Sequence, residues 1–190
     1  IIYGPRGTKK FVSKIMDTWK DERLLRIKYE SRSSSSAFNT IIKEFKSEGK
    51  FKIKDLKVSY FEVDHKPVKY AYGFNFFNKN KKLTISGDTK PCENLIKHAQ
   101  KADVLLHEVF IDGEFKVTNR MRTKKTLHNV RAYHTPSTIL GKIAKLTNCK
   151  KLVLTHLVPT KFNENKLKNT IKKDYGKNPI IGKDLLKIRI

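Results

Sequence analysis

The chain has 190 residues, of which 42 are Lys or Arg and 18 are Asp or Glu, so its formal net charge is +24. Its length and its 38% share of hydrophobic residues suit one folded domain with a real core, which excludes a disordered basic tail. No apolar run approaches the ~18–20 residues that a membrane span needs.

The predicted elements begin with a strand end and a turn over residues 2–7. Apolar residues then recur on one helical face across residues 11–19, and a serine-rich loop fills residues 29–39. A second short helix is expected over residues 38–45, because its apolar residues are spaced by three or four and Gly49 follows.

Alternating apolar residues then predict a series of strands. The alternation is cleanest over residues 68–76, so one face of that strand is expected to be buried. The strands expected in this part of the chain are residues 51–53, 58–60, 68–76 and 83–85.

The second half of the chain alternates helices with short buried strands. Helices are expected over residues 95–102, from Thr135 as N-cap onward, and around residues 167–171, whereas residues 111–133 suggest a long basic loop. The expected strands are residues 104–106, 152–154 and 180–190. This order predicts a layered α/β (or α+β) fold and a single domain over residues 1–190.

The charge of +24 lies far above the roughly 2–8 of a small soluble domain. It predicts a polyanionic partner, with RNA, DNA or an anionic membrane surface as candidates. The alternative is codon bias in an A+T-rich genome, because Lys supplies 34 of the 42 basic residues. Only Cys92 and Cys149 occur, without a CxxC pair, so we expect a reducing compartment, the cytoplasm or the mitochondrion.

Polar residues stand where short apolar strands end. Asp88, Glu108 and His156 each follow or close a buried run, and His65 follows another. Strand ends are where α/β proteins place their chemistry, because a rigid scaffold meets an open loop there. Asp and His together suit zinc, manganese or iron.

The order of these runs resembles the metallo-β-lactamase fold, in its ribonuclease Z-like and arylsulfatase-like branch. The most specific runs are Ser-Gly-Asp-Thr, Leu-His-Glu and Leu-Thr-His, in this order and spacing. The resemblance implies most of an αββα sandwich. The matching segments are residues 2–7, 63–65, 85–91, 102–108, 134–136, 152–157 and 182–185.

The resemblance also implies a role for each matching polar residue. His65 would complete the first metal site, Asp88 would bridge two metals, and His156 would belong to the second site. His134 would contact the scissile phosphate and help to protonate the leaving oxygen, with Glu108 orienting it. Two metals need a shared anion, and they make hydroxide available near neutral pH.

One family motif is absent, namely the His-x-His-x-Asp-His that supplies most of the ligands. The resemblance therefore implies two zinc ions (or manganese or iron) if that motif precedes Ile1, and no tightly bound metal for this chain alone. The start at Ile1 favours an N-terminally incomplete domain over a non-catalytic relative.

The expected function is a metal-dependent phosphodiesterase of the ribonuclease Z-like type, with RNA in tRNA 3′ processing as a candidate substrate. The family's long tRNA-binding arm is absent between His65 and Asp88. The alternative is a non-catalytic, basic RNA-binding component of a ribonucleoprotein such as a ribosome, and a homodimer is a further possible assembly. In either case the expected RNA contacts are Arg120, Arg122, Lys124 and Lys125.

Overall fold

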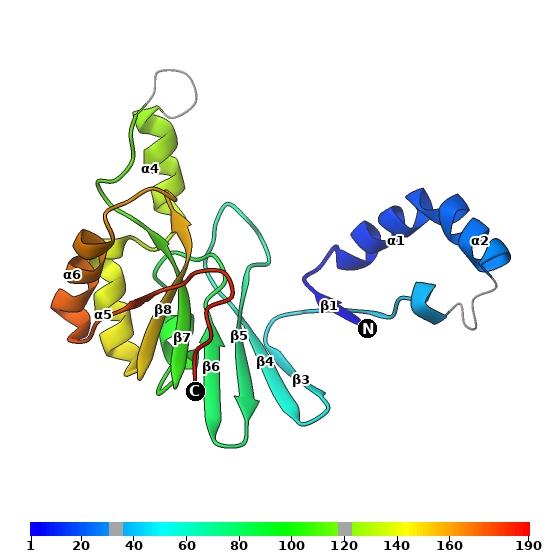
Figure 1. The fold of residues 1–190 in the computed structure, drawn as a ribbon, viewed down its shortest axis with the longest axis horizontal. Helices are drawn as coiled ribbons and strands as arrows, with labels where there is room; N and C mark the ends of the chain where they lie inside the picture. Colours follow the sequence, from blue (N-terminus) through cyan, green and yellow to red (C-terminus); the bar gives the residue numbers. More distant parts are fainter. Residues whose placement is uncertain (31–35, 118–122) are drawn as a thin grey trace. The chain divides into compact units, whose positions relative to one another are not determined.

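A computed structural model describes residues 1–30, 36–117 and 123–190. The chain packs into two compact units, residues 1–47 and residues 48–190 (Figure 1). This division does not test the expected single domain over residues 1–190, which stays a prediction. No helix in the described part of the chain combines the length and apolar character that a membrane crossing needs.

The first unit is a two-stranded parallel sheet whose strands are connected along the chain by two helices. Strand β1 pairs with β2 in the register Ile2↔Ile42 to Gly4↔Glu44. The elements are β1 (Ile2–Gly4), α1 (Thr8–Thr18), α2 (Lys20–Tyr29), the short 3₁₀ helix η1 (Ser36–Phe38) and β2 (Ile42–Glu44).

The predicted helix over residues 38–45 is therefore wrong, because tertiary pairing overrides the local spacing there. The Phe45 N–H donates to the Gly4 carbonyl, and the Glu44 carboxylate accepts from the N–H groups of Gly7 and Lys9. These bonds hold residues 42–45 extended against β1 and satisfy free N–H groups at the start of α1.

The second unit contains a seven-stranded sheet in the order β3-β4-β5-β6-β7-β8-β9. Strands β3 to β6 run antiparallel, and β6 to β9 run parallel. The mixed sheet confirms the predicted α/β class. The strands are β3 (Gly49–Ile53), β4 (Leu56–Glu62), β5 (Tyr72–Asn78), β6 (Lys81–Ile85), β7 (Val104–Phe110), β8 (Lys151–Val158) and β9 (Ile180–Ile181).

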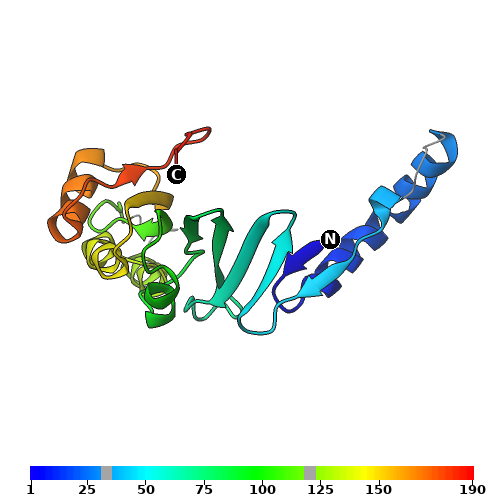
Figure 2. The ribbon, with the colours of Figure 1, turned by 90° about the horizontal axis from the view of Figure 1, so that it is seen from below.

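Helices pack on one face of the parallel strands. In two views α5 and α6 lie beside β7 and β8 (Figures 1 and 2). Leu105, Leu152 and Leu154 of the strands are buried in one core with Leu140 of α5 and Ile171 of α6. The helices of this unit are α3 (Glu93–His98), α4 (Lys124–Ala132), α5 (Ser137–Thr147) and α6 (Glu164–Tyr175).

Two predicted strands are shorter than the apolar alternation suggested. The strand expected over residues 68–76 begins only at Tyr72, because the Val68 N–H bonds the His65 carbonyl in a turn and Tyr70 has a left-handed φ of 60°. The closing strands expected over residues 180–190 reduce to Ile180–Ile181, and after Gly182 bonds Leu154 the sheet pairing ends.

Two further corrections concern the segment before α5. Within the expected basic loop, residues 124–132 form α4, and the Thr123 hydroxyl caps that helix by accepting from the Thr126 N–H at 3.1 Å. Thr135 is not the N-cap of α5. Its hydroxyl donates to the Thr89 carbonyl at 2.7 Å, and Pro136 occupies the cap position without a side-chain bond.

Gly87 is required by the turn that follows β6. Its φ is +62°, and a Cβ atom there would collide with the Tyr72 carbonyl oxygen. Gly176 offers a matched control, because its φ is +80° but nothing would contact a Cβ. We expect Gly87→Ala to lower the free energy of unfolding by about 2–3 kcal/mol and Gly176→Ala by about 1 kcal/mol, measured by urea denaturation. Equal losses would show that the Tyr72 contact carries no cost.

Candidate metal centre

Polar side chains from separate segments converge at the ends of the parallel strands. The His156 Nε2 lies 3.7 Å from Asp88 Oδ2, and the His134 Nδ1 lies 3.3 Å from Glu108 Oε1. The rings of His134 and His156 are stacked with their centroids 5.3 Å apart. The His65 ring lies 5.1 Å from that of His134. These residues are called the histidine–carboxylate site below.

All the metal-site and catalytic residues proposed from the sequence thus fall within this one site. His65 is held in place by its Nδ1, which lies 2.8 Å from the Tyr133 carbonyl oxygen. The structure places His65, Glu108 and His134 in buried positions, whereas Asp88 and His156 are partly open to solvent. The roles implied for them by resemblance stay predictions.

The donor atoms fit a divalent metal ion. In the described part of the chain, one ligand atom from each of Glu108, His134 and His156 lies within 4.8 Å of the others. Glu108 Oε2 and His134 Nδ1 are buried there without a hydrogen bond. Imidazole nitrogen and carboxylate oxygen are ordinary zinc ligands.

A β-bulge directs His156 into the site. Glu108 pairs with Thr155 and Val109 with Leu157, so His156 is the unpaired extra residue. Its φ of 43° is unusual for a residue with a side chain. Bulges re-aim side chains next to active sites, and this one turns His156 away from the alternation of β8.

The Glu108 carboxylate also binds the neighbouring backbone. Its Oε1 accepts from the Thr135 N–H at 2.8 Å and from the Thr89 N–H at 3.2 Å. Sequence reasoning missed both threonines as site-forming residues. Their position inside the runs Ser-Gly-Asp-Thr and His-Thr-Pro was the available signal.

His107 belongs to the core rather than to the site. It is fully buried, and strand alternation places it on the opposite face of β7 from Glu108. Burial lowers the pKa of His107, which outweighs the opposing effect of the nearby Glu108 carbonyl and carboxylate. The ring therefore stays neutral near pH 7 and acts as a packing residue.

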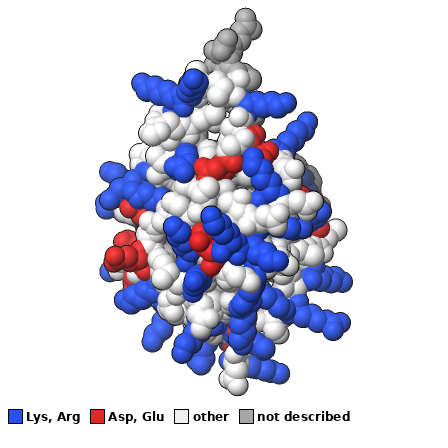
Figure 3. All heavy atoms as spheres, turned by 90° about the vertical axis from the view of Figure 1, so that its left-hand side faces the viewer, with Lys and Arg blue, Asp and Glu red and all other residues white. Residues whose placement is uncertain are grey.

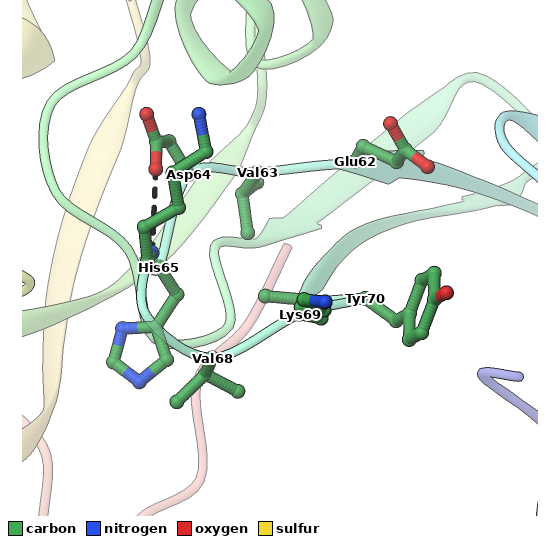
Figure 4. A pocket seen from close by; sticks show the side chains of 9 residues that line it. Glu62, Val63, Asp64, His65, Val68, Lys69 and Tyr70 are labelled. Carbon is green, nitrogen blue, oxygen red and sulfur yellow. Dashed lines mark hydrogen bonds between the residues drawn. The ribbon is translucent and has the colours of Figure 1, made fainter. Parts of the chain in front are cut away.

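An open pocket of about 410 Å³ adjoins His65 and is lined by residues 62–66 and 68–71. Figure 4 shows Asp64 and His65 on the loop that forms one end of this pocket, with Glu62 and Tyr70 at the other. Burial raises the pKa of Asp64, but hydrogen bonds from Lys90 and the Lys66 N–H outweigh it, so the pKa lies below its usual value.

The expected RNA contacts are only partly within the described residues. Lys124 and Lys125 are exposed at the start of α4, whereas Arg120 and Arg122 lie outside the described residues. Basic side chains are not confined to α4. Figure 3 shows them spread over the side of the molecule on which α5 and α6 lie.

The family model for "Anti-Pycsar protein Apyc1" matches residues 11–133, which is more than half of the chain. The chain belongs to this family. The match ends just before His134, so the family model spans His65, Asp88 and Glu108 but not His134 or His156.

Similar proteins place this Apyc1-family chain among metallo-β-lactamase-fold proteins. Ribonuclease Z of Bacillus licheniformis is 35% identical over 100 residues, covering 50% of the chain and 29% of that protein. The metallo-β-lactamase-fold protein YhfI from Bacillus subtilis is 19% identical with a TM-score of 0.62, covering 82% of the chain and 56% of YhfI. Human tRNase Z, short form (ELAC1), is 18% identical with a TM-score of 0.61, covering 100% of the chain and 67% of ELAC1.

These matches confirm the metallo-β-lactamase fold and the ribonuclease Z-like resemblance. The chain spans about three tenths of the length of the Bacillus licheniformis ribonuclease Z that it matches. Substrate, partners and activity of the whole protein are therefore taken up as proposals.

The two N–H bonds to Glu108 predict an asymmetric response to substitution. Glu108→Ala leaves the buried amides of Thr89 and Thr135 unpaired, at about 1–3 kcal/mol each. Glu108→Gln keeps an acceptor oxygen and should retain most of the stability. Thermal and urea unfolding of both variants measure this difference. If both variants lose the same stability, the Glu108 carboxylate does not hold the two loops together.

Proposed function

We propose that this Apyc1-family chain carries the leaving-group acid and part of the metal site of a metal-dependent phosphodiesterase of the ribonuclease Z-like type. The observation that supports this most directly is the convergence of His65, Asp88, Glu108, His134 and His156 at one end of the parallel strands. The fold and the ribonuclease Z relatives point to the same class.

Each side chain has a task in this proposal. His65, Asp88 and His156 would hold zinc, manganese or iron, and a bound metal would make hydroxide available near neutral pH. Glu108 Oε1 lies 3.3 Å from the Nδ1 of His134, where it would orient that ring. The Nε2 of His134 is then the atom that delivers a proton to the leaving oxygen.

The donors of this chain do not fill two zinc sites. His65, Asp88 and His156 would leave each metal with one imidazole and a shared carboxylate, whereas zinc takes three or four ligands. The 190-residue chain by itself is therefore expected to retain no tightly bound zinc. Zinc titration followed by dialysis and elemental analysis measures this.

In the full-length protein, substitutions at Asp88 and His134 should separate metal binding from proton transfer. Asp88→Ala should abolish hydrolysis of bis(p-nitrophenyl) phosphate and of an RNA with a 3′ extension, because it removes a shared ligand. His134→Ala should slow both reactions by roughly 10²–10⁴ with metal still bound. Kinetics and elemental analysis of the same samples provide the two readouts.

His98→Ala serves as the matched control, because His98 contacts Glu48 at 3.2 Å and is no member of the histidine–carboxylate site. Its activity and metal content should equal those of the unmodified protein. Loss of metal from His134→Ala would instead make His134 a ligand, as its place beside Glu108 and His156 allows. A fully active Asp88→Ala variant would refute the proposed chemistry.

The second candidate is a non-catalytic, basic RNA-binding component of a ribonucleoprotein. The net charge of +24 and the small donor set favour it. Phosphate contacts would make RNA affinity fall with salt, at a slope near −0.7 per phosphate on single strands. Replacing Arg120, Arg122, Lys124 and Lys125 together with Ala should flatten that slope for all sequences alike, because contacts to phosphate carry no sequence information.

The matched control removes equal charge from α5 and α6 by replacing Lys142, Lys145, Lys172 and Lys173 with Ala. Fluorescence anisotropy at several salt concentrations compares the two variants on the same single-stranded RNA. Equal losses of RNA affinity in the two variants would show that binding depends on the overall positive charge and not on the segment 120–125. If neither variant changes RNA affinity, the excess of lysine reflects codon bias.

Family membership adds a role to be tested rather than a substrate. We propose that the full-length protein has the anti-Pycsar role that the family is named for. The Asp88→Ala variant tests whether such a role needs the histidine–carboxylate site. A homodimer stays a proposal. A reducing location, in the cytoplasm or the mitochondrion, is also a proposal, and the free thiols of Cys92 and Cys149 favour it.

A further inference from the structure

Asp112, which follows β7, binds both ends of the segment that carries His134. Its Oδ1 accepts from Arg131 Nε at 2.7 Å, and its Oδ2 accepts from the Thr138 hydroxyl at 2.7 Å and from the Thr138 N–H at 3.3 Å. The Asp112 N–H donates to the Ser137 hydroxyl at 3.1 Å. One residue therefore connects the last turn of α4 with the first turn of α5.

These bonds satisfy groups that would otherwise lack partners. The first turn of α5 has free N–H groups, and its N-cap residue, Pro136, offers no side-chain acceptor. Asp112 supplies the acceptor from another strand end, and a carboxylate is favourable at a helix N-terminus. Arg131 lies in the last turn of α4, where a cation is favourable.

The segment between these ends is also restrained at Tyr133, whose carbonyl oxygen lies 2.8 Å from His65 Nδ1. The His134 N–H makes a long bond of 3.3 Å to the Arg131 carbonyl, so Arg131 helps to locate the histidine backbone on that side. On the other side, Thr135 is fixed by Glu108 Oε1, by the Thr89 carbonyl and by the Phe110 N–H. Releasing Arg131 would remove one restraint on the α4 side of His134 and leave the His65 and Thr135 contacts in place.

We propose that Asp112 is a positioning residue for His134, acting through Arg131 and Thr138 to hold the ring against Glu108. Asp112 is about one-fifth exposed and does not belong to the histidine–carboxylate site. In this proposal Asp112 acts on the geometry of His134 through Arg131 and Thr138. The proposal rests on the proposed function only for its kinetic readout.

The first readout is independent of activity. In the full-length protein, nitrogen-15 spectra of the His134 imidazole report its tautomer and environment, with assignment from the spectrum of His134→Ala. Asp112→Ala should shift or broaden the His134 signals, whereas those of His98 stay unchanged. Asp112→Asn keeps an acceptor for Thr138 and should restore part of the original spectrum.

The second readout is catalytic. Asp112→Ala should lower kcat about 10–100-fold, as the loss of outer-shell partners commonly does, and leave KM and metal content unchanged. Glu114→Ala is the matched control, because it breaks the 2.9 Å Lys166–Glu114 pair on the same loop without touching α4 or α5's first turn. Arg131→Met, which keeps an unbranched apolar stem but removes the guanidinium group, replaces Asp112→Ala if that variant fails to fold.

The outcomes separate the two proposals. If the unmodified full-length protein hydrolyses no phosphodiester, the proposed function fails, but shifted His134 signals in Asp112→Ala still support the positioning role. If Asp112→Ala and Arg131→Met both leave the His134 signals identical to those of Glu114→Ala, Asp112 is a structural anchor only and the inference is wrong.

Discussion

The buried carboxylate of Glu108 is the constraint on which the site depends. A buried carboxylate is costly unless it is hydrogen-bonded, so the chain must bring donors to it. The loop after β6 and the segment before α5 do so through the Thr89 and Thr135 amides. Asp88 and His134, next to these threonines in the sequence, are thereby carried to the same place. The hydrogen bonds to one buried carboxylate thus bring together residues that are far apart in the sequence.

Much of the fold could be predicted because its signals are local. The runs at β6, β7 and β8 are short, apolar and followed by polar groups, so both the strands and the positions of Asp88 and His156 could be predicted from the sequence. Strand β2 could not be predicted from the sequence, because its partner β1 lies about 40 residues earlier and the spacing of its isoleucines locally predicts a helix. Pairing over such separations leaves no trace in local spacing.

The candidate site divides in the same way. Residue type and order, together with the family resemblance, suggested His65, Asp88, Glu108, His134 and His156, and the structure brings these side chains together. Neither order nor spacing could show that Thr135 bonds Thr89 instead of capping α5. Asp112 gave no signal either, because its bonds to Arg131 and Thr138 exist only once α4 and α5 have formed.

The β-bulge in β8 leaves His156 outside the packing of the hydrophobic core. Leu152 and Leu154 point into the core, and strict alternation would send residue 156 there as well. Because of the extra residue, Leu157 takes the inward position and packs against the core. His156 lies in the histidine–carboxylate site instead. Position 156 can therefore change without repacking the interior. Substitutions at position 156 can therefore change the histidine–carboxylate site while the scaffold still folds, so a shared fold does not by itself imply a shared site.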